Sequence, residues 1–181
     1  MNKYFLLLLF LLPLGLSAQS PAGLFDLRIG FGPTAFGSGD MKGFMVENEL
    51  NYTINSAFSA SFSLGVGYSD DGINFSSSFL QSNLNAYYAP FGNGKRYIFR
   101  LGAGMTYLRY REIIPSNSNI PDSQTLDQKY EFRNKLSPGF SFLIDNTYHI
   151  NEKILAGATL RMQRYTTDVS GSILVKIGIK I

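Results

Sequence analysis

The chain has 181 residues, of which 45% are hydrophobic and only 16% charged, and its formal net charge is +3 at pH 7. Soluble domains usually carry about 25% charged residues, so this composition argues against an ordinary water-soluble domain. The absence of cysteine excludes disulfides, thiolate chemistry and a cysteine-attached lipid. The positive charges form no basic cluster, so we expect no nucleic-acid binding.

The N-terminal segment predicts a secretory signal peptide. A short basic start precedes an almost wholly apolar run over residues 4–16, and small residues follow up to Ala18. This order of basic, apolar and small residues is typical of signal peptides. An N-terminal membrane anchor is disfavoured because the run is shorter than the about 20 residues of a membrane-spanning helix. We therefore expect residues 1–18 to be removed and residues 19–181 to form a single domain.

Residues 58–68 show the clearest pattern after this leader. Every second residue in the segment is apolar, and the residues between are serine or glycine. Successive side chains of a β-strand point to opposite faces, so the segment predicts a strand with one apolar face and one small, polar face. The same alternation recurs along the chain and predicts eight strands. These strands cover residues 25–32, 44–55, 58–68, 80–88, 99–107, 140–150, 154–163 and 172–181.

The length and number of these segments suit a membrane barrel. A tilted strand crosses a bilayer in about 9–11 residues, which is close to the length of each segment. Bacterial outer-membrane barrels have an even number of strands, and closure removes the sheet edges that lipid cannot satisfy. The sequence therefore predicts an all-β fold, an eight-stranded antiparallel up-and-down transmembrane β-barrel.

The connections between the strands alternate in length. The first, third, fifth and seventh connections surround residues 37–43, 69–74, 111–131 and 166–171. They are in general longer than the second, fourth and sixth, which surround residues 55–57, 90–96 and 151–153, although 90–96 is long for a turn. Outer-membrane barrels have short periplasmic turns and longer outside loops. We therefore expect the first, third, fifth and seventh connections to lie outside the cell.

Aromatic residues are predicted at both ends of the strands. Such girdles are expected at the two membrane interfaces, because a tyrosine ring is apolar and its hydroxyl is polar. At the periplasmic ends we expect Tyr52, Tyr88, Tyr97 and Tyr148. At the outer ends we expect Phe36, Phe44, Tyr68, Tyr107 and Tyr165.

The leader, the eight segments and the alternating connections together resemble the bacterial outer-membrane β-barrel domain family, and most nearly its small OmpA/OmpX-type barrels. The resemblance covers roughly residues 24–181 and rests on the pattern alone. Members commonly end in an aromatic residue that helps the insertion machinery recognise the last strand, whereas this chain ends in Ile181. The resemblance implies a monomer in the outer membrane of a Gram-negative cell, in contact with its lipid and inserted by that machinery.

The inward-facing rows carry nearly balanced charges. An eight-stranded barrel is just wide enough for its own side chains to fill it, and unpaired charges in such a space are costly. We therefore expect a salt-bridge network in which Arg28 pairs with Glu47 or Glu49. This network could plug the lumen or line a gated ion path, and the plug is favoured. Its predicted members are Asp26, Arg28, Glu47, Glu49, Arg100, Asp145, Arg161, Lys176 and Lys180.

Asp145 is expected to pair with Arg100 or Arg161 rather than to serve catalysis. Its only histidine neighbour on the same strand face, His149, lies four residues further on, about 13 Å away at ~3.4 Å per residue. No motif places a serine nucleophile beside this histidine. One histidine and no cysteine are also a poor donor set for a metal. We therefore expect no enzyme activity, no catalytic or metal site and no cofactor.

The connection around residues 111–131 is the best candidate for a specific contact. It places four apolar residues, Ile113, Ile114, Ile120 and Leu126, among polar ones. Exposed apolar residues in an outside loop can bind an unidentified surface partner. They can equally fold over the mouth of the barrel, and the sequence does not decide between these alternatives.

Three functions fit the predicted barrel. The first is a structural or surface-interaction role through the outside loops, and the second is a narrow pore for ions or small solutes. The third is a soluble, lipocalin-like carrier, in which the polar row would face water. That row is rich in glycine, serine and asparagine, whereas a water-exposed surface normally carries more charge. The first function is therefore favoured.

Overall fold

The computed structural model describes residues 25–36, 41–70, 76–91, 96–115, 130–166 and 168–181. The expected leader, residues 1–18, lies outside them. Within the described part of the chain, no helix is long and apolar enough to cross a membrane. The strands are β1 (Phe25–Phe36), β2 (Met41–Thr53), β3 (Phe58–Asp70), β4 (Ser76–Tyr88), β5 (Tyr97–Pro115), β6 (Tyr130–His149), β7 (Ile154–Tyr165) and β8 (Val169–Lys180).

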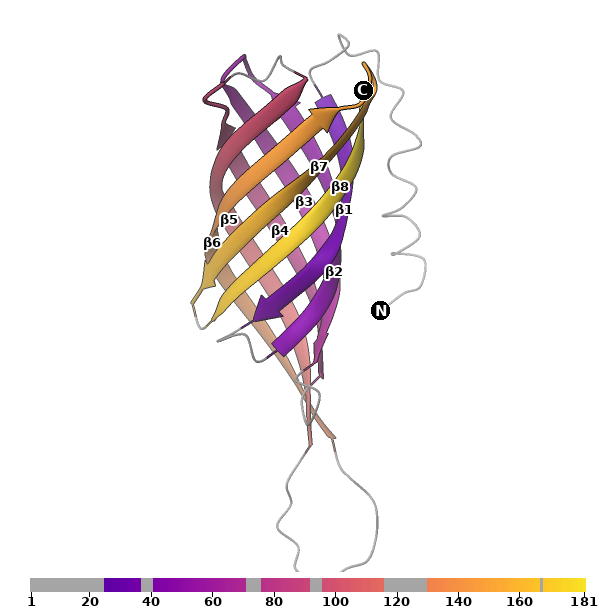
Figure 1. The fold of residues 1–181 in the computed structure, drawn as a ribbon. Coiled ribbons are helices and arrows are strands. Elements are labelled where there is room, and N and C mark those ends of the chain that lie inside the picture. Colours follow the sequence, from indigo (N-terminus) through magenta and orange to yellow (C-terminus); the bar gives the residue numbers. More distant parts are fainter. Residues whose placement is uncertain (1–24, 37–40, 71–75, 92–95, 116–129, 167) are drawn as a thin grey trace, which may run out of the picture.

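The eight strands form one closed antiparallel sheet (Figure 1). Each strand pairs with its neighbour in sequence, and β8 pairs with β1 to complete the barrel. At this seam the backbone N–H of Ile181 donates to the carbonyl of Phe25 at 2.9 Å. Closure leaves no open sheet edge in the wall that lipid would have to cover. The predicted eight-stranded up-and-down barrel is confirmed.

Short turns gather at one end of the barrel, which we call the turn end. In the turn between β2 and β3, Oδ1 of Asn55 accepts hydrogen bonds of 2.8 Å from the backbone N–H groups two and three residues later. Asn151 does the same between β6 and β7, at 2.9 and 2.7 Å. An asparagine side chain stabilises a tight turn in this way without a longer loop.

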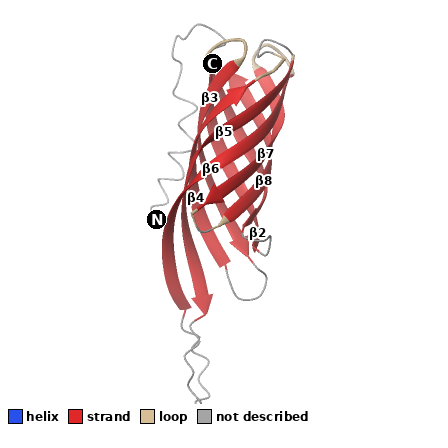
Figure 2. Ribbon diagram, turned by 90° about the vertical axis from the view of Figure 1, so that its left-hand side faces the viewer, coloured by secondary structure: helices blue, strands red, loops and turns tan. Residues whose placement is uncertain are grey.

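Strands β5 and β6 define the opposite end, the hairpin end. They have 19 and 20 residues, against 12 or 13 in β1 and β3, and continue as a two-stranded ribbon beyond the barrel wall (Figures 1 and 2). The expected loop over residues 111–131 is therefore too long, because β5 reaches Pro115 and β6 begins at Tyr130. The apolar pattern ends earlier because Arg109 takes the next outward position after Tyr107.

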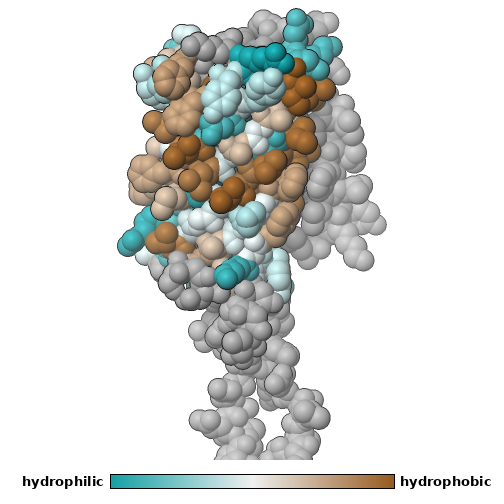
Figure 3. Space-filling view, viewed as in Figure 1, coloured by the Kyte–Doolittle hydropathy of each residue, from teal (hydrophilic) through white to brown (hydrophobic). Residues whose placement is uncertain are grey.

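The outer surface of the barrel wall is apolar. Outward side chains such as Phe62, Leu84 and Phe142 are 48%, 59% and 67% exposed. Figure 3 shows hydrophobic residues over the middle of the wall and hydrophilic residues mainly toward its two ends. Exposed aromatic residues ring both ends, as expected. They are Tyr52, Tyr88, Tyr97 and Tyr148 at the turn end, and Phe44, Tyr68 and Tyr107 toward the hairpin end.

Two aromatic residues expected in the outer ring instead face the interior. Tyr165 is 2% exposed, and Phe36 packs against buried residues inside the barrel. The alternation explains both positions. Tyr165 follows Arg161 and Gln163 on the inward row of β7, so its ring cannot face lipid without a break in the strand. The prediction for these two residues was wrong because it considered their level along the barrel and not their side of the sheet.

Candidate functional site

The inward faces of six strands place eight charged side chains inside the barrel. Each is at most 7% exposed, although charged residues are rarely so buried unless they are paired. Four are acidic and four are basic, so the set is electrically balanced. These residues are Asp26, Glu47, Glu49 and Asp145, with Arg28, Arg100, Arg161 and Lys176.

One group of contacts surrounds Asp145. Arg100 donates to its Oδ2 from Nε at 2.9 Å and from Nη2 at 2.7 Å. Arg28 Nη1 lies 3.5 Å from the same oxygen, and Thr159 donates to Oδ1 at 2.7 Å. The Nε atom of Arg28 also lies 2.5 Å from Oδ1 of Asp26. Thr147 also donates to Oδ2, at 3.0 Å, so the carboxylate of Asp145 is held by two arginines and two hydroxyls.

A second group crosses the lumen from β2 to β7 and β8. Arg161 Nη2 donates to Oε1 of Glu47 at 2.7 Å, and its Nη1 contacts the other carboxylate oxygen. Lys176 Nζ lies 3.2 Å from Oε1 of Glu47 and 2.5 Å from Oε2 of Glu49. Paired, two-point contacts of this kind fix orientation as well as distance. The bond between Glu47 and Arg161 therefore joins β2 to β7, two strands that are not neighbours in the sheet.

The structure brings most of the predicted network together but changes some partners. The expected pair of Arg100 and Asp145 is present, and the two face each other in the β5–β6 register. Arg28 pairs with Asp26 and Asp145 instead of the expected glutamates, since Asp26 lies two residues away on the same strand face. Lys180 lies half-buried at the turn end and joins none of the ion pairs among the described residues.

A layer of amides and hydroxyls connects these ion pairs to the rest of the interior. Ser63 donates to Glu47 at 3.0 Å and accepts from Asn83 at 2.9 Å. The side-chain oxygen of Asn83 accepts from both Gln81 and Gln163, each at 2.9 Å. Because buried polar groups must find partners, this layer extends the hydrogen bonding from the charges to the neighbouring polar side chains inside the barrel.

The interior nearer the hairpin end is apolar, which sequence reasoning missed. There Phe36 packs edge-on against Phe79, with ring centroids 4.9 Å apart. The available signal was apolar residues within otherwise polar inward rows, such as Leu174 between Ser172 and Lys176. We call this group the apolar cluster, and its members are Met45, Phe79, Leu108, Tyr110, Tyr165 and Leu174.

The remaining candidate residues form no catalytic or metal-binding group among the residues that the structure describes. His149 ends β6 half-buried, and the carboxylate of Asp145 is already engaged by Arg100 and Arg28. No three potential metal-ligating residues gather within the described residues. Of the apolar residues expected to make outside contacts, Ile113 and Ile114 belong to β5. Ile120 and Leu126 lie outside the described part of the chain.

A closed antiparallel barrel with an apolar exterior and buried charges in its interior is an integral outer-membrane β-barrel. Its exposed apolar rows, bounded by aromatic rings, place it in the lipid of that membrane. The balanced interior charges are the counterpart of that exterior, because they would be costly on the lipid-facing side.

Solved structures of small outer-membrane barrels share this fold. The chain is similar to Neisserial surface protein A, with a TM-score of 0.63, 17% identity and coverage of 90% of this chain and 100% of that one. It is similar to OprG from Pseudomonas aeruginosa, with a TM-score of 0.60, 12% identity and coverage of 87% and 95%. For Ail of Yersinia pestis, solved with a heparin analogue, the TM-score is 0.58, identity 10% and coverage 87% and 97%.

Comparisons of sequence find no relative for this chain. No protein-family model matches it, and no curated protein matches it. At 17% identity or less, the solved structures establish the fold alone. A specific role must therefore be argued from the chain's own residues.

Proposed function

We propose that this outer-membrane barrel has a lumen filled by side chains, conducts no large ion current, and acts through contacts at its hairpin end. The observation that carries the proposal is the balanced set of buried ion pairs that joins strands which are not neighbours in the sheet. The contact of Glu47 in β2 with Arg161 in β7 lies across the path that an ion would take. The apolar cluster lies between these pairs and the hairpin end.

The physical cost of opening supports a plug over a pore. Separating Arg161 from Glu47 would leave the guanidinium without its ion-pair partner, and the carboxylate with Lys176 as its only one among the described residues, in a space where each side chain is 0% exposed. Breaking one side of a buried pair costs about 3–5 kcal/mol. An open path would also have to wet the apolar cluster, whose lining offers water few hydrogen-bond partners.

The ribbon of β5 and β6 is the part of the barrel best placed for contacts outside the membrane. It projects past the wall, and we propose that the hairpin end faces the cell exterior. Its partner is an unidentified surface component, and the role is structural or adhesive and does not involve catalysis. We further propose that the barrel acts as a monomer, surrounded by outer-membrane lipid and inserted by the machinery that assembles such barrels.

Planar bilayer recording tests the filled lumen. The purified wild-type barrel is expected to show no large, stable unitary currents. The double variant Phe79→Ala/Arg161→Ala removes bulk from both layers of the plug and should conduct. Phe142→Ala truncates a lipid-facing ring of the same size and should stay silent. Large, stable currents from the wild type would overturn the plug in favour of the narrow pore.

Cysteine labelling tests the orientation, because the chain has no native cysteine. Ser118→Cys, between β5 and β6, is expected to react with a membrane-impermeant maleimide on intact cells. Glu152→Cys, in the exposed turn between β6 and β7, should react only after the cells are lysed. The opposite labelling pattern would place the hairpin end in the periplasm and overturn the proposed surface role.

A further inference from the structure

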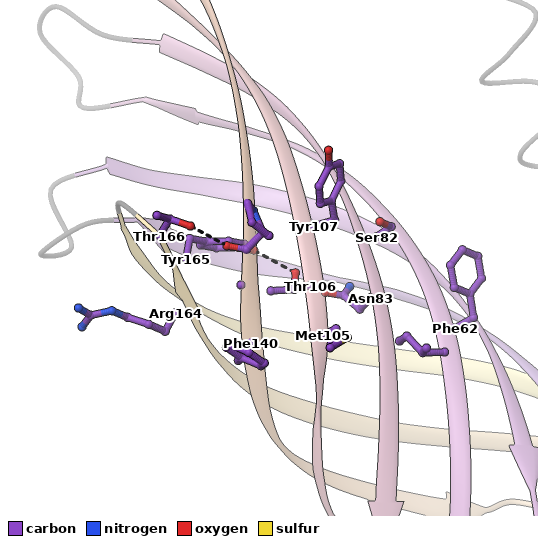
Figure 4. A pocket seen from close by; sticks show the side chains of 13 residues that line it. Phe62, Ser82, Asn83, Met105, Thr106, Tyr107, Phe140, Arg164, Tyr165 and Thr166 are labelled. Carbon is purple, nitrogen blue, oxygen red and sulfur yellow. Dashed lines mark hydrogen bonds between the residues drawn. The ribbon is translucent and has the colours of Figure 1, made fainter.

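A groove of about 670 Å³ lies in the outward face of the barrel wall, across β4 to β7 (Figure 4). The strand register builds its apolar side. Leu84 faces Met105 in the β4–β5 pairing, Met105 faces Phe140 in the β5–β6 pairing, and Phe62 precedes them on β3. All four side chains are between 48% and 65% exposed. They form one continuous apolar row across four strands.

The groove is hollow because short residues stand beside this row. The next level toward the hairpin end pairs Ser82 with Tyr107 and Tyr107 with Pro138, so a tall ring stands between two short side chains. The β6–β7 pairing begins only at Gly139. Proline has no N–H to continue a ladder, and Thr166 Oγ1 instead donates to the carbonyl of Pro138 at 3.3 Å. The groove therefore lies where the paired part of β6 and β7 ends.

One exposed arginine, Arg164, lines the groove, and a second, Arg109, lies beyond the groove on β5. Arg164 faces Phe140 in the β6–β7 register, and Figure 4 shows it extending away from the wall. Arg109 lies on the same outward face of β5, two residues beyond Tyr107. Neither arginine forms an ion pair with any residue that the structure describes. A cation beside lipid is destabilising unless it reaches the interface or an anion.

We propose that this groove binds a phosphorylated glycolipid of the outer leaflet, with an acyl chain along the apolar row and phosphate on Arg164 and Arg109. Arginine suits phosphate because its planar guanidinium donates two parallel hydrogen bonds. The two Cα atoms are roughly 17 Å apart, from ~3.4 Å per residue and ~4.8 Å per strand, a gap that two long side chains and one headgroup span. The assignment to the outer leaflet rests on the orientation proposed above.

Native mass spectrometry of the detergent-purified full-length barrel tests this site. The probes are a diphosphorylated, multi-acyl glycolipid, its dephosphorylated form and phosphatidylglycerol. The wild type should retain the diphosphorylated glycolipid in preference to the other two. Arg109→Gln/Arg164→Gln should weaken its binding about 10-fold or more, because each charge-assisted hydrogen bond contributes about 1.5–3 kcal/mol and 1.4 kcal/mol is tenfold. Ser82→Phe should weaken binding by filling the groove.

Lys42→Gln is the matched control, because it removes an exposed cation at the same end of the barrel but on β2, away from the groove. An equal loss with this variant would show general surface attraction and overturn the site. Equal retention of the dephosphorylated form, or of phosphatidylglycerol, would also overturn it. The comparison of the three lipids uses the wild-type protein, so it tests the site even if a variant fails to fold. Binding in detergent does not depend on which end of the barrel faces the cell exterior. The labelling experiment can therefore contradict the proposed orientation without contradicting lipid binding in the groove, and the reverse also holds.

Discussion

The two halves of the barrel interior are equally buried, but the side chains that fill them interact in different ways. Arg161 lies in the charged half and Leu174 in the apolar cluster, and both are 0% exposed. Apolar packing depends mainly on volume, so residues of similar size substitute for one another at modest cost. Paired charges require particular partners in particular positions. The charged half therefore specifies which strands face each other, and the apolar half is the part of the proposed plug that depends on volume alone.

The first test of this comparison removes one charge from the middle of the lumen. In Arg161→Met, Glu47 keeps its hydrogen bond from Ser63 but only one ion pair, with Lys176, which also pairs with Glu49. We expect a loss of about 3–5 kcal/mol in the free energy of unfolding, because an incompletely paired charge stays buried. Urea titration of the barrel in lipid vesicles, followed by its gel shift between boiled and unboiled samples, measures this loss.

The double variant Arg161→Met/Glu47→Leu is the control for that loss. It removes the stranded carboxylate and leaves Lys176 paired with Glu49. Much of the stability should return, since replacing a buried pair by apolar residues of similar volume is often neutral. A double variant as unstable as Arg161→Met would show that the arginine contributes by packing and would erase the distinction between the two halves.

A cavity in the apolar cluster should have the next largest effect. Leu174→Ala is expected to cost about 3 kcal/mol, because the lost contacts and the residual cavity both destabilise the folded barrel. The neighbouring Val175 faces outward and is 50% exposed, so Val175→Ala should cost less, as lipid can fill the space. The same urea titration compares them. Equal losses would mean that the cluster is no better packed than the lipid-facing wall.

The strands of the barrel wall could be predicted from sequence, whereas the side-chain contacts inside the barrel were predicted less completely. Alternation assigns side chains to a face with few assumptions, and it placed Glu47 and Asp145 inside, where both are buried. It also predicts the β5–β6 hairpin, in which Arg100 lies opposite Asp145. Contacts between strands that are adjacent in sequence are therefore within reach of pattern reasoning.

Contacts across the lumen were beyond that reasoning. Arg161 and Glu47 are separated by 114 residues, and which of them meet depends on strand tilt and on the stagger at closure. The apolar cluster was missed for another reason. Met45 and Leu174 are apolar residues in otherwise polar inward rows, and only the closed barrel shows that such residues gather at one level. The groove bordered by Arg164 likewise depends on where β6 leaves β7.

Two glycines on β3 sharpen the comparison at smaller magnitude. A Cβ at Gly67 would lie 2.2 Å from Cζ of Phe79 and 2.6 Å from the carbonyl of Phe44, so ring and backbone both obstruct it. Gly67→Ala should cost about 2 kcal/mol through overpacking of the apolar cluster. At Gly65 the closest atom, at 2.8 Å, is the flexible Cε of Met45. Gly65→Ala should therefore be nearly neutral, and equal urea midpoints for the two variants would contradict tight packing at Phe79.

The smallest expected effect comes from one hydroxyl in the charged half. Tyr87 donates to Oε1 of Glu49 at 3.3 Å, and the guanidinium of Arg100 lies 4.6 Å from the centre of its ring. Tyr87→Phe removes the hydrogen bond but keeps the ring, so we expect a loss of about 1 kcal/mol by urea titration. Tyr87→Leu also removes the cation–π contact and should lose about 1 kcal/mol more. A neutral Tyr87→Phe would mean that Lys176 alone satisfies Glu49. The arrangement of the charged half would then be determined by its ion pairs and not by the hydroxyls around them.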